Sequence, residues 1–160
     1  MSEQTGVFTH LDASGHARMV DVTAKSPTVR TATAEGLVRC PAAVVSALRD
    51  GTVPKGDVLA VARIAGIQAA KRCAELLPLA HVIGVHAASV DLDVTDEGVR
   101  IQATVGTADR TGVEMEALTA VSVAGLAVVD MVKGIDKDVS IEGVRLVAKT
   151  GGKSGDWIRA

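Results

Sequence analysis

The sequence predicts an α+β fold in which helices pack on one face of an antiparallel sheet. The first observation is size: the chain has 160 residues, 48% hydrophobic and 22% charged, which fits one domain with a single core. The second is the order of apolar patterns, which runs strand, helix, strand, strand, helix, strand when two adjacent helices are counted as one. That order is typical of a ferredoxin-like sandwich.

The first third of the chain supplies strands and a short helix. Residues 18–23 are predicted as a short strand. Residues 28–39 are predicted as a longer strand, since β-branched residues alternate there with other residues along the run. Pro41 suits a first helical turn, and the helix predicted over residues 42–48 is closed near Gly51.

A long helix is predicted next, from Asp57 to about Leu77. Asp57 belongs to the residue types that cap helix N-termini, and Pro78 ends the helical pattern. Small side chains dominate the apolar stripe of this helix, so a neighbouring element can approach closely. The stripe consists of Leu59, Ala62, Ala65, Ala69 and Cys73.

The second half of the chain supplies a hairpin, a helix and a strand. Residues 85–94 and 99–107 alternate in part and are joined by the turn sequence of residues 96–98, which predicts a hairpin. Residues 113–132 are rich in Ala, Leu, Val and Met and are predicted as a helix. Residues 139–148 are predicted as the last strand.

These elements form one predicted ferredoxin-like domain over residues 18–150. Residues 1–17 show no apolar periodicity and are predicted as a flexible N-terminal arm. Residues 151–160 are predicted as a Gly/Lys-rich C-terminal tail.

Composition excludes several classes of function. The formal net charge is -2 and no run of Lys and Arg exceeds two residues, so the basic footprint of a nucleic-acid binder is missing. Phe8 and Trp157 are the aromatic residues, which argues against base stacking. Residues 1–10 carry no signal-peptide pattern. We therefore expect a cytoplasmic protein that binds neither nucleic acid nor membrane, with Cys40 and Cys73 as buried thiols.

Asp130 and Lys133 are the first candidates for chemistry. They lie three residues apart in the last predicted helix, so both project from one side of it. A solvated ion pair explains that spacing. Apolar neighbours also allow a second interpretation, in which a carboxylate and an ammonium at the edge of a pocket exchange protons with a substrate.

Two acids at the start of the same helix raise a question of distance. Glu114 and Glu116 suit the first helical turn, where acids complement the helix dipole. Fourteen residues separate Glu116 from Asp130, which is about 21 Å along a helix axis. One subunit cannot bring both to one reacting atom. If both serve one site, either the substrate is long or the site is shared between chains of an oligomer.

Several lysines stand where an anion could bind. Lys55 precedes the predicted helix cap Asp57, and a helix N-terminus with a lysine beside it suits a phosphate. Lys149 and Lys153 bracket a Gly-Gly pair whose bare amides can join them in holding phosphate oxygens. For each of these lysines, a solvated position on a loop or tail is the alternative.

The histidines do not predict a metal site. His81 and His86 lie in the middle of the chain, and Asp91 or Asp93 would make only a poorly spaced third ligand. A hydrogen-bonding or proton-handling role for His81, in the loop between helix and strand, is the favoured interpretation.

A set of ordered motifs spans nearly the whole chain. The motifs are Met19–Val22, Lys55–Asp57, Ala62–Lys71, Thr111–Thr119, Asp130–Met131 with Lys133, and Ala148–Lys149 with Gly151–Gly152. In these residues the chain resembles the cyclic pyranopterin monophosphate synthase family of molybdenum cofactor biosynthesis. The resemblance implies a ferredoxin-like homohexamer, a trimer of dimers with pockets between subunits. It implies a cofactor-free lyase that converts (8S)-3',8-cyclo-7,8-dihydroguanosine 5'-triphosphate to cyclic pyranopterin monophosphate and diphosphate.

The resemblance also implies roles for single residues. Asp130 corresponds to the family's catalytic aspartate and Lys133 to its partner lysine, as a general acid/base pair. Lys55 and Lys149 correspond to lysines that engage the triphosphate. The other substrate-binding positions it implies are Leu79, Ala80, His81, Met115, Glu116, Arg30 and Arg63.

The chain departs from the family pattern in one loop. The family usually reads Leu-Cys-His-Pro, whereas this chain has Ala80 and Val82 in place of the cysteine and the proline. These changes reshape a substrate-contacting loop and define a rival hypothesis, a catalytically impaired paralogue that acts as a nucleotide-binding or regulatory hexamer.

Overall fold

A five-stranded antiparallel sheet forms one layer of the molecule. The computed structural model describes residues 9–160, so part of the predicted N-terminal arm lies outside the described residues. The strands lie side by side in the order β2-β3-β1-β4-β5. Their bounds are β1 (Thr28–Arg39), β2 (Ala87–Thr95), β3 (Gly98–Asp109), β4 (Ser140–Thr150) and β5 (Trp157–Ile158).

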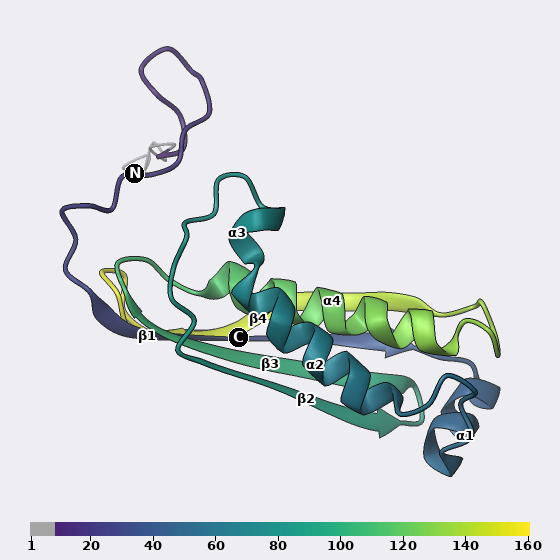
Figure 1. The fold of residues 1–160 in the computed structure, drawn as a ribbon. Coiled ribbons are helices and arrows are strands. Elements are labelled where there is room, and N and C mark those ends of the chain that lie inside the picture. The colour runs from purple at the N-terminus through teal and green to yellow at the C-terminus, as the bar shows by residue number, and fades with distance from the viewer. Residues whose placement is uncertain (1–8) are drawn as a thin grey trace.

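Helices form the second layer. Figure 1 shows α2 and α4 lying together on one face of the sheet, with α1 beyond one end of the strands. The helices are α1 (Ala42–Asp50), α2 (Val58–Lys71), α3 (Cys73–Leu76) and α4 (Glu114–Val132). The predicted α+β fold, with helices on one face of an antiparallel sheet, is confirmed.

Alternation along the central strand divides the two faces of the sheet. On β1, Ala32, Ala34 and Val38 are buried under the helices, while the side chains between them face away from the core. The β2–β3 hairpin that flanks β1 turns at Gly98, which has a φ of 136°. A Cβ there would lie 1.9 Å from the carbonyl oxygen of Val38, so the close approach of the hairpin to β1 requires glycine.

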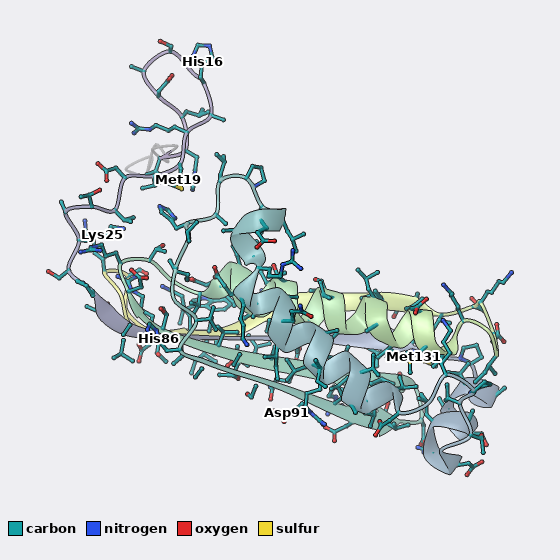
Figure 2. The ribbon with its side chains drawn as sticks, in the orientation of Figure 1. His16, Met19, Lys25, His86, Asp91 and Met131 are labelled. Carbon is teal, nitrogen blue, oxygen red and sulfur yellow. The ribbon has the colours of Figure 1, made fainter. Side chains whose placement is uncertain are left out.

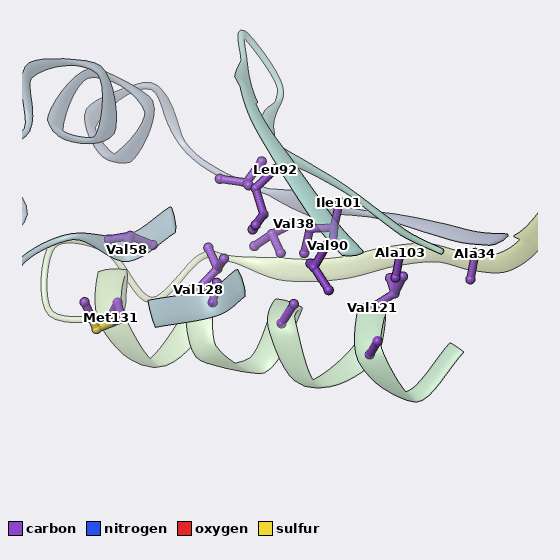
Figure 3. Close-up of a cluster of buried hydrophobic side chains, with 14 of the residues drawn as sticks. Ala34, Val38, Val58, Val90, Leu92, Ile101, Ala103, Val121, Val128 and Met131 are labelled. Atoms are coloured by element: carbon purple, nitrogen blue, oxygen red, sulfur yellow. The ribbon is translucent and has the colours of Figure 1, made fainter. Parts of the chain in front are cut away.

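Small residues let the two long helices pack closely. A Cβ added at Gly66 of α2 would lie 2.9 Å from the carbonyl oxygen of Ala120 in α4 and 3.2 Å from the Cβ of Ala124. Valine and alanine fill the layer between helices and sheet, as Figure 3 shows for a cluster that includes Val90 and Val121. The closest approach of the two helices thus lies at Gly66, which the predicted stripe did not include, while Cys73 of that stripe lies 3.5 Å from Thr119 of α4.

The helix α4 is apolar because it is the central helix of the core. By length and composition alone it could span a membrane. Nine of its residues are buried in the fold, including Glu116 near its start and Met131 near its end. The two ends of this helix therefore stay fixed relative to the sheet.

Three local expectations differ from the structure. Residues 18–23 form no strand, and their backbone is held instead by side chains, since the carbonyl of Val20 bonds His81. The helix predicted from Asp57 to Leu77 breaks at Arg72 into α2 and α3. The C-terminal tail contains the two-residue strand β5, which the sequence did not predict because only its pairing with β4 defines it.

Candidate active site

Asp130 stands between two lysine side chains at the C-terminal end of α4. The Nζ of Lys133 lies 2.7 Å from Asp130 Oδ1, as the i,i+3 spacing predicts. The Nζ of Lys55, from the loop before α2, lies 3.3 Å from Oδ2 and donates to the Asp130 carbonyl at 2.8 Å. We call these three residues the carboxylate–lysine cluster.

The cluster keeps Asp130 ionised and reachable. The hydrogen bond from Lys133, and then that from Lys55, lowers the pKa of Asp130 below its ordinary value. The side chain of Asp130 is nevertheless 58% exposed. An isolated surface ion pair consists of one acid and one lysine. Here two lysines share one carboxylate, so the cluster carries an excess positive charge and is open to an anionic ligand.

A pocket of about 450 Å³ opens at the other end of α4. It lies between the segment of residues 9–25, the loop after α3 and the start of α4. We call it the α4 pocket. Its lining residues are Thr9, His10, Val20, Val22, Lys25, Leu79, Ala80, His81, Thr111, Gly112, Glu114, Met115 and Glu116.

Glu116 is the buried acid of this pocket. Its side chain is only 4% exposed, and burial raises the pKa of its carboxyl group above the ordinary value. Asp130, on the same helix, shows the opposite shift. The raised pKa means that this carboxyl group keeps its proton to a higher pH than an exposed glutamate does.

His81 joins the loop after α3 to the N-terminal segment. Its Nε2 lies 2.6 Å from the carbonyl oxygen of Val20, so this nitrogen carries the hydrogen and donates. His81 therefore makes a hydrogen bond within the chain, and its role toward a ligand stays a prediction. Leu79 and Ala80, on the same loop, line the pocket beside Met115, which is 45% exposed.

Arg30 and Lys149 lie near the rim of this pocket. Arg30 donates through Nε to the carbonyl of Asp109 at 3.2 Å and through Nη2 to that of Arg110 at 3.3 Å. Gly152 has a φ of 78° and abuts the guanidinium of Arg30, since a Cβ there would lie 2.5 Å from Nη1. Lys149 donates to Ser154 and lies 3.9 Å from Glu114, so it too borders the start of α4.

The predicted site residues thus fall into two groups. Lys55 lies in the carboxylate–lysine cluster, and Lys149 lies with the pocket residues at the opposite end of α4. The 19 residues of α4 span about 28 Å, so within one chain the two lysines cannot hold the same phosphate. Arg63 donates to the carbonyl of Val90 at 3.0 Å and ties α2 to β2. Figure 2 shows the separation, with Met131 at one end of α4 and Lys25 beyond the other.

Two further features have no place in this site. A larger hollow on the uncovered face of the sheet contains none of the predicted site residues, and ion pairs such as that between Arg145 and Glu35 line it. Within residues 9–160, no group of three potential ligands could hold a metal ion. His86 accepts from the backbone N–H of Ala108 at 3.2 Å.

The site residues predicted from the sequence did not include the N-terminal wall of the pocket. The wall is lined by Val20, Val22 and Lys25. Val20 and Val22 lie in the predicted short strand of residues 18–23, and Lys25 lies between that segment and β1. The available signal was the Met19–Val22 motif, whose residues belong to no helix or strand.

An α+β sandwich with an exposed carboxylate–lysine cluster, and a pocket lined by His81 and the buried Glu116, fits an enzyme class that acts on a small, charged substrate. The model of the MoaC family matches residues 19–152, and the chain belongs to that family. It is 58% identical to the cyclic pyranopterin monophosphate synthase of a Nocardioides species, over 99% of each chain. It is 60% identical to the synthase of that name from Streptomyces coelicolor, over 96% of this chain and 90% of that one. A Chloroflexus aurantiacus relative of the same name is 54% identical over 99% of each chain.

Proposed function

We propose that the chain is a lyase of molybdenum cofactor biosynthesis. It converts (8S)-3',8-cyclo-7,8-dihydroguanosine 5'-triphosphate to cyclic pyranopterin monophosphate with release of diphosphate. The observation that carries the proposal is Asp130 held between two lysines, in a chain 54–60% identical, over nearly its whole length, to relatives named for making this product. None of these relatives has a name that supports the rival hypothesis of a non-catalytic hexamer.

Asp130 and Lys133 transfer protons in this proposal. Ring opening and ring closure both need a base and an acid next to the reacting atoms. Asp130 supplies the base. Two lysines lower its pKa and so keep its carboxyl group ionised and able to accept a proton. Lys133, 2.7 Å away, is the ammonium that can return a proton. Lys55 stabilises the same carboxylate and offers its charge to a phosphate oxygen.

The α4 pocket binds the pterin-forming half of the substrate. Glu116 and His81 offer hydrogen bonds at its inner wall, and Leu79, Ala80 and Met115 supply contact surface. Lys149 and Arg30 at the rim face the triphosphate. Arg63 is assigned to the site through its two Nη atoms, because its Nε already donates to the carbonyl of Val90. No cofactor takes part.

The complete site is formed between subunits. Asp130 of the carboxylate–lysine cluster lies about 21–24 Å along the helix axis from Glu116 and Glu114 of the α4 pocket, which is too far for one reacting centre. A neighbouring copy that brings its cluster to this pocket would restore one site. We assign the assembly as a homohexamer, a trimer of dimers, that works in the cytoplasm without nucleic acid or membrane.

Product formation tests the proposal. The purified chain is incubated with the cyclised dihydro-GTP, and cyclic pyranopterin monophosphate is measured as its fluorescent oxidation product beside released diphosphate. We expect product from the native chain and a loss of roughly 10²- to 10⁴-fold in the Asp130→Ala variant. The matched control is Asp93→Ala, which removes an exposed acid from the uncovered sheet face. No product from a folded native chain would contradict the function, and equal loss in both variants would contradict the role of Asp130.

A further inference from the structure

The segment Met19–Lys25 forms one wall of the α4 pocket. Val20, Val22 and Lys25 line the pocket opposite residues of α4 and of the loop after α3. Figure 2 labels Met19 and Lys25 at the two ends of this segment, which runs past the end of the sheet before β1 begins. Without this wall the pocket would be an open surface.

Side chains of the domain hold the segment at both ends. His81 Nε2 donates to the carbonyl of Val20 at 2.6 Å, and Arg110 Nε donates to that of Lys25 at 3.0 Å. Between these points the chain turns locally, with the N–H of Thr23 bonded to Asp21 Oδ1 at 2.9 Å. The segment therefore has a set shape that fixes where the Lys25 side chain starts.

Lys25 has the only lysine ammonium that lines the pocket within the described residues. No ion pair or hydrogen bond of its Nζ is found in residues 9–160, whereas Lys149 at the rim is already near Glu114 and Ser154. Arg110 links Lys25 to Arg30, since Arg30 donates to the carbonyl of Arg110 while Arg110 donates to that of Lys25. Three cationic residues are thus linked through backbone carbonyls, and of these Lys25 lines the pocket while Arg110 precedes the lining residue Thr111.

We propose that Lys25 binds the phosphate chain of the substrate and that Arg110 is a positioning residue that holds Lys25 in place. This inference rests on the proposed function, because it names how that substrate's polyphosphate is held. An exposed ammonium that has no partner among residues 9–160, on a backbone held by the Arg110 guanidinium, is suited to bind a phosphate oxygen. The segment before β1 is then part of the substrate site.

Binding of inorganic tripolyphosphate to the full chain tests the inference without turnover. We expect the dissociation constant from calorimetry to rise about tenfold or more in Lys25→Ala, and to stay within about threefold in Lys25→Arg, which keeps the charge. The matched control is Arg100→Ala, which removes an exposed cation from the uncovered face of the sheet and should change binding less than twofold.

The role of Arg110 is tested by a double-variant cycle. If Arg110 acts through Lys25, the Arg110→Ala and Lys25→Ala changes together should weaken binding no more than Lys25→Ala alone. Additive losses would overturn the positioning role. A native chain that binds no tripolyphosphate, or a Lys25→Ala variant that binds like Arg100→Ala, would overturn the proposal for Lys25. If tripolyphosphate binding depends on Lys25 but the native chain forms no product, the proposed function is contradicted and the phosphate site at Lys25 is still supported.

Discussion

The two ends of α4 place an acid in opposite surroundings. Asp130, near the C-terminal end, is more than half exposed and bonded to two lysines, and its pKa is lowered. Glu116, near the N-terminal end, is almost fully buried in a pocket wall, and its pKa is raised. One helix thus presents one acid that stays ionised and one that holds a proton more readily.

The difference shows that environment, not residue type, divides the chemical roles. Charge neighbours control the first acid and desolvation controls the second. Pairs of titratable groups whose surroundings push their pKa values apart are the arrangement that acid/base catalysis uses. The variants Lys133→Ala and Glu116→Gln each remove one source of this contrast.

Removing Lys133 should have the largest effect. Lys133→Ala is expected to lower turnover by roughly 10²- to 10⁴-fold and to raise the pKa of Asp130, because the Lys133 hydrogen bond is the largest cause of the lowered value. Lys55→Ala should raise that pKa by less. Carbon-13 NMR titration of the Asp130 carboxyl and the acid limb of the pH–rate profile measure both changes, with Arg100→Ala as the control. An unmoved pKa in Lys133→Ala would contradict this account of the cluster.

Neutralising Glu116 should change how stability depends on pH. A carboxyl group with a higher pKa in the folded than in the unfolded chain binds more protons when folded, so stability falls as pH rises from the ordinary pKa through the raised one. Glu116→Gln keeps the shape and removes that loss. We expect its Tm to exceed the native Tm by more at about pH 8 than at about pH 5.

Thermal unfolding followed by circular dichroism across this pH range provides the measurement for Glu116. The control is Asp93→Asn, which neutralises an exposed acid on the uncovered face of the sheet; its Tm offset should vary less with pH than that of Glu116→Gln. A Glu116→Gln offset that varies no more with pH than that of the control would mean that burial does not control this carboxyl group.

Restoring the family's proline should have the smallest effect. Val82 is 90% exposed, so Val82→Pro is expected to change turnover by about twofold or less and to stabilise the chain by about 0.4–1 kcal/mol through the unfolded state. Turnover and Tm of Val82→Pro, alone and with Ala80→Cys, measure this. A large gain in turnover would revive the hypothesis that these two positions impair the native chain.

Most of the fold could be predicted because local signals define most of its elements. The predicted strand of residues 28–39 matches β1, and the predicted helix of residues 113–132 differs from α4 by one residue. Non-local contacts decided the failures. Residues 18–23 find no strand partner, and β5 exists only through its pairing with Lys149 and Ala148.

The candidate site could be predicted only in part. Spacing alone brings Asp130 to Lys133, because three residues separate neighbours on a helix face. Nothing in the spacing brings Lys55 to the same carboxyl group, since a loop 75 residues earlier supplies it. The wall built by residues 19–25 depends on hydrogen bonds from His81 and Arg110, which no local pattern encodes.

The short strand β5 gives the molecule an optical reporter. Trp157 is the one tryptophan of a chain without tyrosine, and it pairs with Lys149 on β4 while the Arg159 guanidinium lies 5.4 Å from the centre of its ring. Indole emission therefore reports on the C-terminal strand beside Lys149 and not on most of the valine-rich core. Fluorescence of the unlabelled chain can follow ligand binding at the rim separately from global unfolding.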